Sequence, residues 1–267
     1  MRNSFIKKIS YTVLDWINLG KGVARNINGI KILFPAKWSR YYEKDYEAEN
    51  YKFLKKYLTP GMDVIDIGAH LGLFSTFCSK LTNKTGNIIC FEPTPGTFAV
   101  LTETLRLNHC NNVTAIQAAV SDKNGTATFY VSHTAGCNSN SLLKNRSDKE
   151  LSAYEVKLVT IDSITSDYSL KPSLIKIDVE GAELDALKGG IETFNKFKPV
   201  LILGLHPDFI KLKGDSLETI WDLLQKNHYI IRFNGAAMTK DDFCGQKLLF
   251  DVHCFQPQTL LKDILIK

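Results

Sequence analysis

Short apolar runs alternate with amphipathic segments along most of this chain. Runs rich in Val, Ile, Leu and Phe predict strands, and apolar residues at helical spacing predict helices. Strands that alternate with helices are typical of a mostly parallel sheet with helices on both faces. The expected strands are 63–67, 87–91, 113–117, 126–132, 155–160, 174–179, 200–205, 228–233 and 247–255, and the expected helices are 42–58, 97–107, 182–188 and 215–227.

The last two expected strands, 228–233 and 247–255, are joined by a segment too short for a crossover helix, so we expect them to pair antiparallel. The predicted fold is an α/β, Rossmann-like three-layer sandwich with a mostly parallel seven-stranded sheet and a C-terminal antiparallel hairpin. Residues 133–149 form a polar segment rich in Ser and Asn. Such a segment contacts substrate or closes over a site, or is a disordered insertion.

The N-terminal part of the chain is distinctly basic. Residues 1–60 contain 12 Lys and Arg against 5 Asp and Glu, and the whole chain has a net charge of +5. Phe5, Ile9 and Val13 recur at helical spacing within this part. We predict a basic amphipathic arm or cap over residues 1–40 and one main domain over residues 41–267. The arm could pack on its own domain, dock a partner or make peripheral contact with an anionic membrane.

Length and composition fit a soluble enzyme. The 267 residues, 44% of them hydrophobic, are enough for a large core. No run approaches the roughly 18 apolar residues that cross a bilayer, and we find no signal-peptide core near the N-terminus. The six cysteines are scattered without a C-x-x-C pair, which fits a reducing compartment. We expect a cytoplasmic protein, with peripheral membrane contact through residues 1–40 left open.

The most informative stretch leads from an apolar strand through Asp66, Gly68, His70 and Gly72 into a helix. Glycines let a backbone pass close to a ligand, and the first N–H groups of a helix point into the same space. Twenty residues after Gly72, a second apolar strand ends at Glu92. A carboxylate at the end of a strand is suited to accept both hydroxyls of a ribose. This pattern predicts a site for a nucleoside cofactor.

The glycine count bears on which cofactor binds. A dinucleotide site uses three glycines as G-x-G-x-x-G, whereas this loop has Gly68 and Gly72, with His70 at the middle position. Asp66 would repel a pyrophosphate but attract the ammonium and sulfonium of S-adenosylmethionine. We therefore favour S-adenosylmethionine over a nicotinamide. The alternatives are a NAD-type oxidoreductase and a non-catalytic protein that binds a partner through the basic arm. For the loop alone, the alternative is a turn in which the two glycines only pack.

A second cluster of polar residues follows the expected strands 174–179 and 200–205. Asp178 and Glu180 come at the end of the first strand, and His206 directly follows the second. Ligands of doubly wound sheets bind beyond the carboxyl ends of the central strands, so these three side chains are candidate catalytic groups. Structural alternatives are a helix N-terminus that favours Glu180 and a hydrogen-bonded core position for His206.

Five motifs together resemble the FkbM-type methyltransferase family. They occur in order over roughly residues 45–206, as Gly61–Gly72, Phe91–Pro93, Ala118–Asp122, Thr160–Asp162 and Lys176–Glu183. The resemblance implies a class I methyltransferase fold and S-adenosylmethionine-dependent transfer of a methyl group to a hydroxyl. The acceptor is commonly a sugar, a glycan or glycolipid, or a natural product.

The resemblance also implies roles for single residues. Asp66, Gly68 and Gly72 would line the methionine end of the cofactor, and Glu92 would hold its ribose. Ala119 and Val120, with Asp122 nearby, would border its adenine. The chain departs from the family pattern in two places, because members often carry Asn where His70 stands and an acid where Gly204 stands.

The charge distribution and the lack of a metal-ligand pattern bear on nucleic acid and metal ions as partners. The part of the chain after residue 60 is nearly neutral, which makes nucleic acid an unlikely substrate. A divalent cation at Asp178 is conceivable, but the sequence offers no second and third ligand, so we assign no metal site. The expected partner is a small-molecule or glycan hydroxyl acceptor. The sequence does not determine the oligomeric state.

Overall fold

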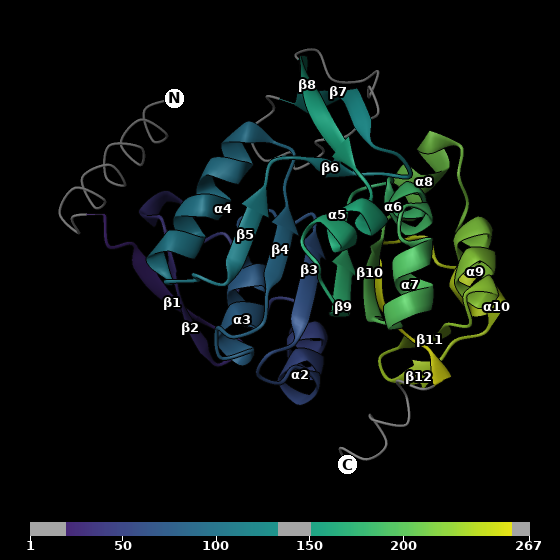
Figure 1. The fold of residues 1–267 in the computed structure, drawn as a ribbon, viewed down its shortest axis with the longest axis horizontal. Helices are drawn as coiled ribbons and strands as arrows, with labels where there is room; N and C mark the ends of the chain where they lie inside the picture. Colours follow the sequence, from purple (N-terminus) through teal and green to yellow (C-terminus); the bar gives the residue numbers. More distant parts are fainter. Residues whose placement is uncertain (1–19, 133–150, 258–267) are drawn as a thin grey trace.

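The computed structural model describes residues 20–132 and 151–257. An eight-stranded sheet lies at its centre (Figure 1). The strand order is β12-β11-β13-β10-β9-β3-β4-β5. The five strands from β10 to β5 run parallel, while β13 pairs antiparallel with both β10 and β11. The predicted mostly parallel sheet of seven strands with a C-terminal antiparallel hairpin is therefore confirmed, and the two-residue β12 extends it at one edge.

The strands of the central sheet are β3 (Asp63–Ile67), β4 (Ile88–Phe91), β5 (Val113–Ile116), β9 (Pro172–Ile177), β10 (Val200–Leu205), β11 (Ile230–Phe233), β12 (Ala236–Ala237) and β13 (Phe250–Phe255). The helices are η1 (Ala36–Trp38), α2 (Ala48–Tyr57), α3 (Leu73–Leu81), α4 (Pro95–Leu107), α5 (Ile161–Asp167), α6 (Glu183–Lys188), α7 (Ile191–Phe197), α8 (Pro207–Lys213), α9 (Leu217–Lys226) and α10 (Lys240–Cys244). Two smaller sheets are β1 (Val23–Ile27) with β2 (Ile30–Phe34), and β6 (Ala119–Val120) with β8 (Leu151–Val159) and β7 (Gly125–Ser132).

The two faces of the central sheet bury different sets of side chains. Val64 faces the helices α2 and α3, while its neighbour Ile65 faces α6 and α7 on the other side. This alternation follows from the two-residue period of a strand, and because both faces are covered the central strands are almost continuously apolar. The result is the three-layer sandwich predicted from the sequence.

Residues 20–40 are part of this packing. The hairpin of β1 and β2 buries Ile27, Ile32 and Phe34 in the same apolar cluster as α2 and α3. The described part of the predicted arm therefore has no core separate from that of the main domain, and it contains strands and a 3₁₀ turn. The helical spacing of Phe5, Ile9 and Val13 lies outside the described residues, as does the whole of the polar segment 133–149.

Several short elements were not predicted. The helices α5, α7 and α8 have seven residues each and show too few turns for a clear apolar period. The helix expected from residue 42 begins only at Ala48, because Glu47 before it has a left-handed backbone with φ of 47°. Tyr42 and Tyr46 consequently lie on an irregular segment. Among the described helices, none has the length and apolar character that a membrane span requires.

Asn108 fastens the N-terminal hairpin to the rest of the domain. Its Oδ1 accepts a hydrogen bond from the Leu33 N–H at 3.0 Å, and its Nδ2 donates to the carbonyls of Leu33 at 2.7 Å and Thr104 at 2.8 Å. We expect Asn108→Ala to lower the free energy of unfolding by roughly 2–3 kcal/mol, since it removes these bonds at a buried position. Urea denaturation measures the change. The exposed Asn111→Ala is the matched control, and an equal loss in both variants would refute the fastening role.

Candidate active site

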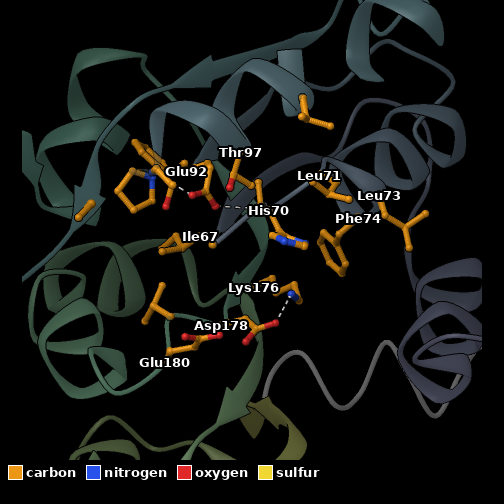
Figure 2. A pocket seen from close by; sticks show the side chains of 18 of the residues that line it. Ile67, His70, Leu71, Leu73, Phe74, Glu92, Thr97, Lys176, Asp178 and Glu180 are labelled. Atoms are coloured by element: carbon orange, nitrogen blue, oxygen red, sulfur yellow. Dashed lines mark hydrogen bonds and ion pairs between the residues drawn. The ribbon is translucent and has the colours of Figure 1, made fainter. Parts of the chain in front are cut away.

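A cavity of about 850 Å³ opens at the carboxyl ends of the parallel strands (Figure 2). This is where ligands bind in open α/β sheets. Eight of the residues predicted from the sequence line it: Gly68, His70, Glu92, Ala119, Val120, Asp178, Glu180 and His206. Segments far apart in the chain thus bring both predicted clusters to one space.

The loop after β3 lies directly against the end of β9. Gly68 has a φ of 82°, and a Cβ atom there would lie 1.9 Å from the carbonyl oxygen of Asp178. The Asp178 N–H donates to the Ile67 carbonyl at 3.0 Å, which holds the two strand ends together. Only glycine fits at this contact, because any side chain would collide with backbone. The loop that bears His70 and the acid of β9 therefore have a fixed relative position.

Three other predicted residues are not part of the cavity wall. Gly72 is the N-cap of α3 with a φ of 83°, and a Cβ there would lie 2.7 Å from Leu101 Cδ1. Asp66 is fully buried below the loop, where Ser75 donates to its Oδ2 at 2.5 Å and its Oδ1 has no hydrogen-bond partner among the described residues. Burial raises the pKa of Asp66 to about 6. Asp122 is exposed outside the cavity. The structure therefore places these three residues behind or beside the site. Gly72 packs against Leu101 of α4, and Asp66 is hydrogen-bonded to Ser75 of α3.

Glu92 closes the other side of the loop. Its Oε2 accepts from the His70 N–H at 3.2 Å and its Oε1 accepts from the Thr94 N–H at 2.9 Å. The side chain is 7% exposed, and burial raises its pKa although the two backbone hydrogen bonds lower it. Each carboxylate oxygen keeps a lone pair that a ligand hydroxyl can use.

His70 is a neutral group in the cavity wall. Burial first, and the positive charge of Lys176 second, lower its pKa to about 4. Its Nδ1 lies 3.0 Å from the Tyr42 hydroxyl, with which it shares a hydrogen bond, and the Tyr41 ring centroid lies 5.0 Å from its own. The imidazole is thus fixed by the N-terminal segment and carries no charge at neutral pH.

Asp178 is paired with a buried lysine that the sequence reasoning did not select. Lys176 is two residues earlier on the same strand, is 6% exposed and donates from Nζ to Asp178 Oδ2 at 2.7 Å. Burial alone would raise the pKa of Asp178, but Lys176 and then His206 outweigh it and lower the pKa. Asp178 is therefore an anion. The Lys-Ile-Asp alternation, which places both side chains on one face of the strand, was a signal for this pair.

His206 is held by a second residue that was not predicted as functional. Glu183, which is 0% exposed, has its Oε1 2.8 Å from His206 Nδ1, while His206 Nε2 lies 3.8 Å from Asp178 Oδ1. Burial lowers the pKa of His206, but the Glu183 hydrogen bond and the nearby carboxylates raise it above its ordinary value of 6.5. A buried carboxylate on Nδ1 fixes the tautomer, so that Nε2 is the atom available to take a proton.

Glu180 is the third predicted catalytic residue, and it lines the cavity near His206. It has a left-handed backbone with φ of 45°, which makes the turn between β9 and α6. Burial raises its pKa to about 7, against the lowering effect of His206. Its Oε2 is buried without a hydrogen-bond partner among the described residues. Glu180 is therefore able to exchange a proton near neutrality.

The far end of the cavity contains aromatic rings and further acids that the sequence did not reveal. Trp38, Tyr41 and Tyr46 come from the segment before α2, and Glu47 and Asp251 lie beside them in the cavity lining. Alternation along β13 was a weak signal for Asp251, and nothing in the sequence pointed to the others. In the parts of the chain that the structure describes, no three His, Cys, Asp or Glu side chains are arranged to hold a metal ion.

The strand order and the cavity at the strand ends define a Rossmann-like class I methyltransferase fold. Residues 66–231 match the sequence profile of the family described as Methyltransferase FkbM domain. This match covers more than half of the chain, and the protein belongs to the FkbM methyltransferase family. The resemblance inferred from the five motifs is confirmed, and the protein is a methyltransferase.

Curated relatives include proteins from archaea, fungi and bacteria. The hexuronic acid methyltransferase AglP of Haloferax volcanii is 26% identical over 80% of this chain and 90% of its own length. The methyltransferase sdnD of Sordaria araneosa is 30% identical, covering 67% of this chain and 78% of its own. The 2-O-methyltransferase NoeI of Sinorhizobium fredii is 28% identical, covering 65% of this chain and 75% of its own length. A crystal structure of methyltransferase FkbM from Methylobacillus flagellatus aligns with a TM-score of 0.46 and 20% identity, over 74% of this chain and 44% of that one.

The Lys176–Asp178 pair gives a prediction for stability. Lys176→Met leaves the Asp178 carboxylate in a largely buried place without its cation, and we expect the free energy of unfolding to fall by about 3–5 kcal/mol. Thermal and urea unfolding measure this loss. The double variant Lys176→Met with Asp178→Asn removes both charges and should recover part of the loss. If the double variant were no more stable than the single one, the pair would not be the cause.

Proposed function

We propose that this protein transfers a methyl group from S-adenosylmethionine to a hydroxyl of a sugar, glycan, glycolipid or natural product. The observation that carries the proposal is the position of His206 and Asp178 in the same cavity as the Gly68 loop and Glu92. A proton acceptor and a nucleoside-type binding loop in one space are what methyl transfer to a hydroxyl requires.

The residues present fit S-adenosylmethionine. Glu92 offers a buried carboxylate for two ribose hydroxyls, and Ala118, Ala119 and Val120 give an apolar wall on which an adenine can lie. Gly68 lets the loop lie against the end of β9 beside the cavity. When bound, this cofactor supplies an electrophilic methyl group on a positively charged sulfur. The carboxylates of Asp178 and Glu180 near the loop would stabilise that positive charge.

His206 is the proposed general base. A hydroxyl is a poor nucleophile at neutral pH, and loss of its proton as the new bond forms lowers the barrier. Glu183 orients the imidazole and stabilises the cation that forms when Nε2 takes the proton. Asp178, 3.8 Å from Nε2, is placed to accept a hydrogen bond from the acceptor and to stabilise the same imidazolium.

The same charges weigh against the alternative of a nicotinamide oxidoreductase. A pyrophosphate would need cations or free N–H groups near the loop, but Lys176 is paired with Asp178 and His70 is neutral. Asp178 and Glu180 would repel its phosphates. A non-catalytic binding protein would not need the Glu183–His206 pair beside the cofactor loop. The names of two relatives, a hexuronic acid methyltransferase and a 2-O-methyltransferase, support a sugar hydroxyl as the acceptor.

Binding of the cofactor is the first test. We expect S-adenosylhomocysteine to bind the purified protein in calorimetric titration and NAD to give no signal. Glu92→Ala should weaken that binding by about 1.5–3 kcal/mol, because charge-assisted hydrogen bonds to the ribose are lost. The exposed Glu192→Gln on α7 is the control. Unchanged affinity in Glu92→Ala would remove Glu92 from the ribose role, and binding of NAD alone would favour the oxidoreductase.

The pH dependence of turnover tests the base. His206 accepts a proton only when neutral and its pKa is raised, so kcat/KM should rise with pH with a midpoint above 6.5. Glu183→Gln removes the largest of the interactions that raise the pKa of His206 and should move the midpoint down. His206→Ala should lower kcat by about 10²–10⁴-fold and abolish this rise. Glu180 titrates in the same range, so Glu180→Gln is measured in parallel. A rise that survived in His206→Ala and vanished in Glu180→Gln would assign the base to Glu180.

A further inference from the structure

The end of the cavity away from Glu92 has an excess of negative charge. Four carboxylates line this end: Glu47, Asp178, Glu180 and Asp251. Lys176 is paired with Asp178, and His206 with the buried Glu183. No ion pair joins Glu47, Glu180 or Asp251 to a cation within the described residues. The remaining lining cation, Lys37, lies over the Trp38 ring at 4.9 Å from its centroid.

Asp251 is held so that one of its oxygens stays available. Asn50 donates from Nδ2 to Asp251 Oδ2 at 2.8 Å and to Glu47 Oε2 at 3.3 Å. The Asn50 amide is itself oriented by His253, whose Nε2 lies 2.9 Å from Asn50 Oδ1. Burial lowers the pKa of His253 to about 4, so this imidazole is neutral and donates its Nε2–H. The network therefore fixes the Asp251 carboxylate without neutralising it.

Gly204 packs closely against two of these carboxylates. A Cβ at this position would lie 3.0 Å from Asp178 Oδ1 and 3.2 Å from Asp251 Oδ1. A side chain here would crowd both oxygens, so glycine lets the two carboxylates lie close to one backbone position. Burial and then Glu47 raise the pKa of Asp251 to about 6; Lys176 and the Asn50 hydrogen bond lower it but do not fully compensate for the burial of its negative charge. A cationic group of a ligand would provide that compensation, and an anionic group would be repelled.

Aromatic rings at the same end provide an independent reason to expect a cation. Tyr41 and Tyr46 are 36% and 38% exposed, and with Trp38 they line the cavity beside Glu47. The faces of Trp and Tyr rings attract ligand cations, and their flat apolar surfaces also cover the ring of a sugar. Carboxylates and aromatic faces together are suited to an ammonium group on a cyclic, hydroxyl-rich ligand.

We propose that the acceptor carries an ammonium group, as a sugar with a free amine does, and that the site between Asp251, Glu47 and the aromatic rings binds it. Acceptors that carry a carboxylate, such as uronic acids, bind poorly. The inference rests on the proposed function. The acceptor of this protein would be positively charged, unlike the hexuronic acid for which one relative is named.

The test compares three methyl glycosides that differ in one group: those of glucosamine, glucose and glucuronic acid. Each is titrated by calorimetry into the full-length protein saturated with S-adenosylhomocysteine, near neutral pH and low ionic strength. We expect the amino sugar to bind at least about tenfold more tightly than the uronic acid, with the neutral sugar between them. Tightest binding of the uronic acid, equal binding of all three, or no binding of any would overturn the inference.

Two variants assign the effect to the site. Asp251→Asn keeps an oxygen that accepts from Asn50 but removes the charge. The preference for the amino sugar over the uronic acid, taken as the ratio of the two affinities, should therefore fall to about threefold or less. Asp167→Asn, on the exposed end of α5, is the matched control and should leave the ratio unchanged. A ratio that Asp251→Asn does not alter would refute the role of Asp251. Methyl transfer is measured separately with labelled cofactor, so a protein that prefers the amino sugar but methylates no hydroxyl would contradict the proposed function and leave the charge preference standing.

Discussion

The contact between the Gly68 loop and the end of β9 is the constraint on which the site depends. Asp178 donates from its backbone to Ile67 and places its carbonyl where any side chain at residue 68 would collide. The loop and the acid therefore keep a fixed distance, independent of the longer side chains around them. Methyl transfer needs such precision, because an in-line displacement is sensitive to the alignment of the reacting atoms.

The charged groups around this contact are paired, and each pair fixes the ionisation or the orientation of one reactive side chain. Lys176 keeps Asp178 ionised, and Glu183 keeps His206 oriented with a raised pKa. Burial keeps His70 neutral in the same wall. The cavity therefore combines an anion, a base and a neutral imidazole within one fold, because burial and partners differ from one side chain to the next.

The N-terminal segment completes the cavity from outside the parallel sheet. Tyr41 and Tyr42 contact His70, and Asn50 in the first turn of α2 donates a hydrogen bond to Asp251. The hairpin of β1 and β2 fixes this segment through Asn108. The sheet therefore holds the loop and the acids, while residues between 37 and 51 form one side of the cavity.

The sequence by itself determined the succession of the central strands along the chain, the antiparallel end of the sheet and eight of the lining residues, because strand periodicity and the Gly68 motif are local. It also brought Glu92, Asp178 and His206 together, since parallel strands end at the same edge. Only the tertiary structure decided which polar groups are paired and which are free. Glu183 and Asp251 acquire their roles from partners on other elements, and burial, which raises the pKa of Asp251, is a property of the packed chain.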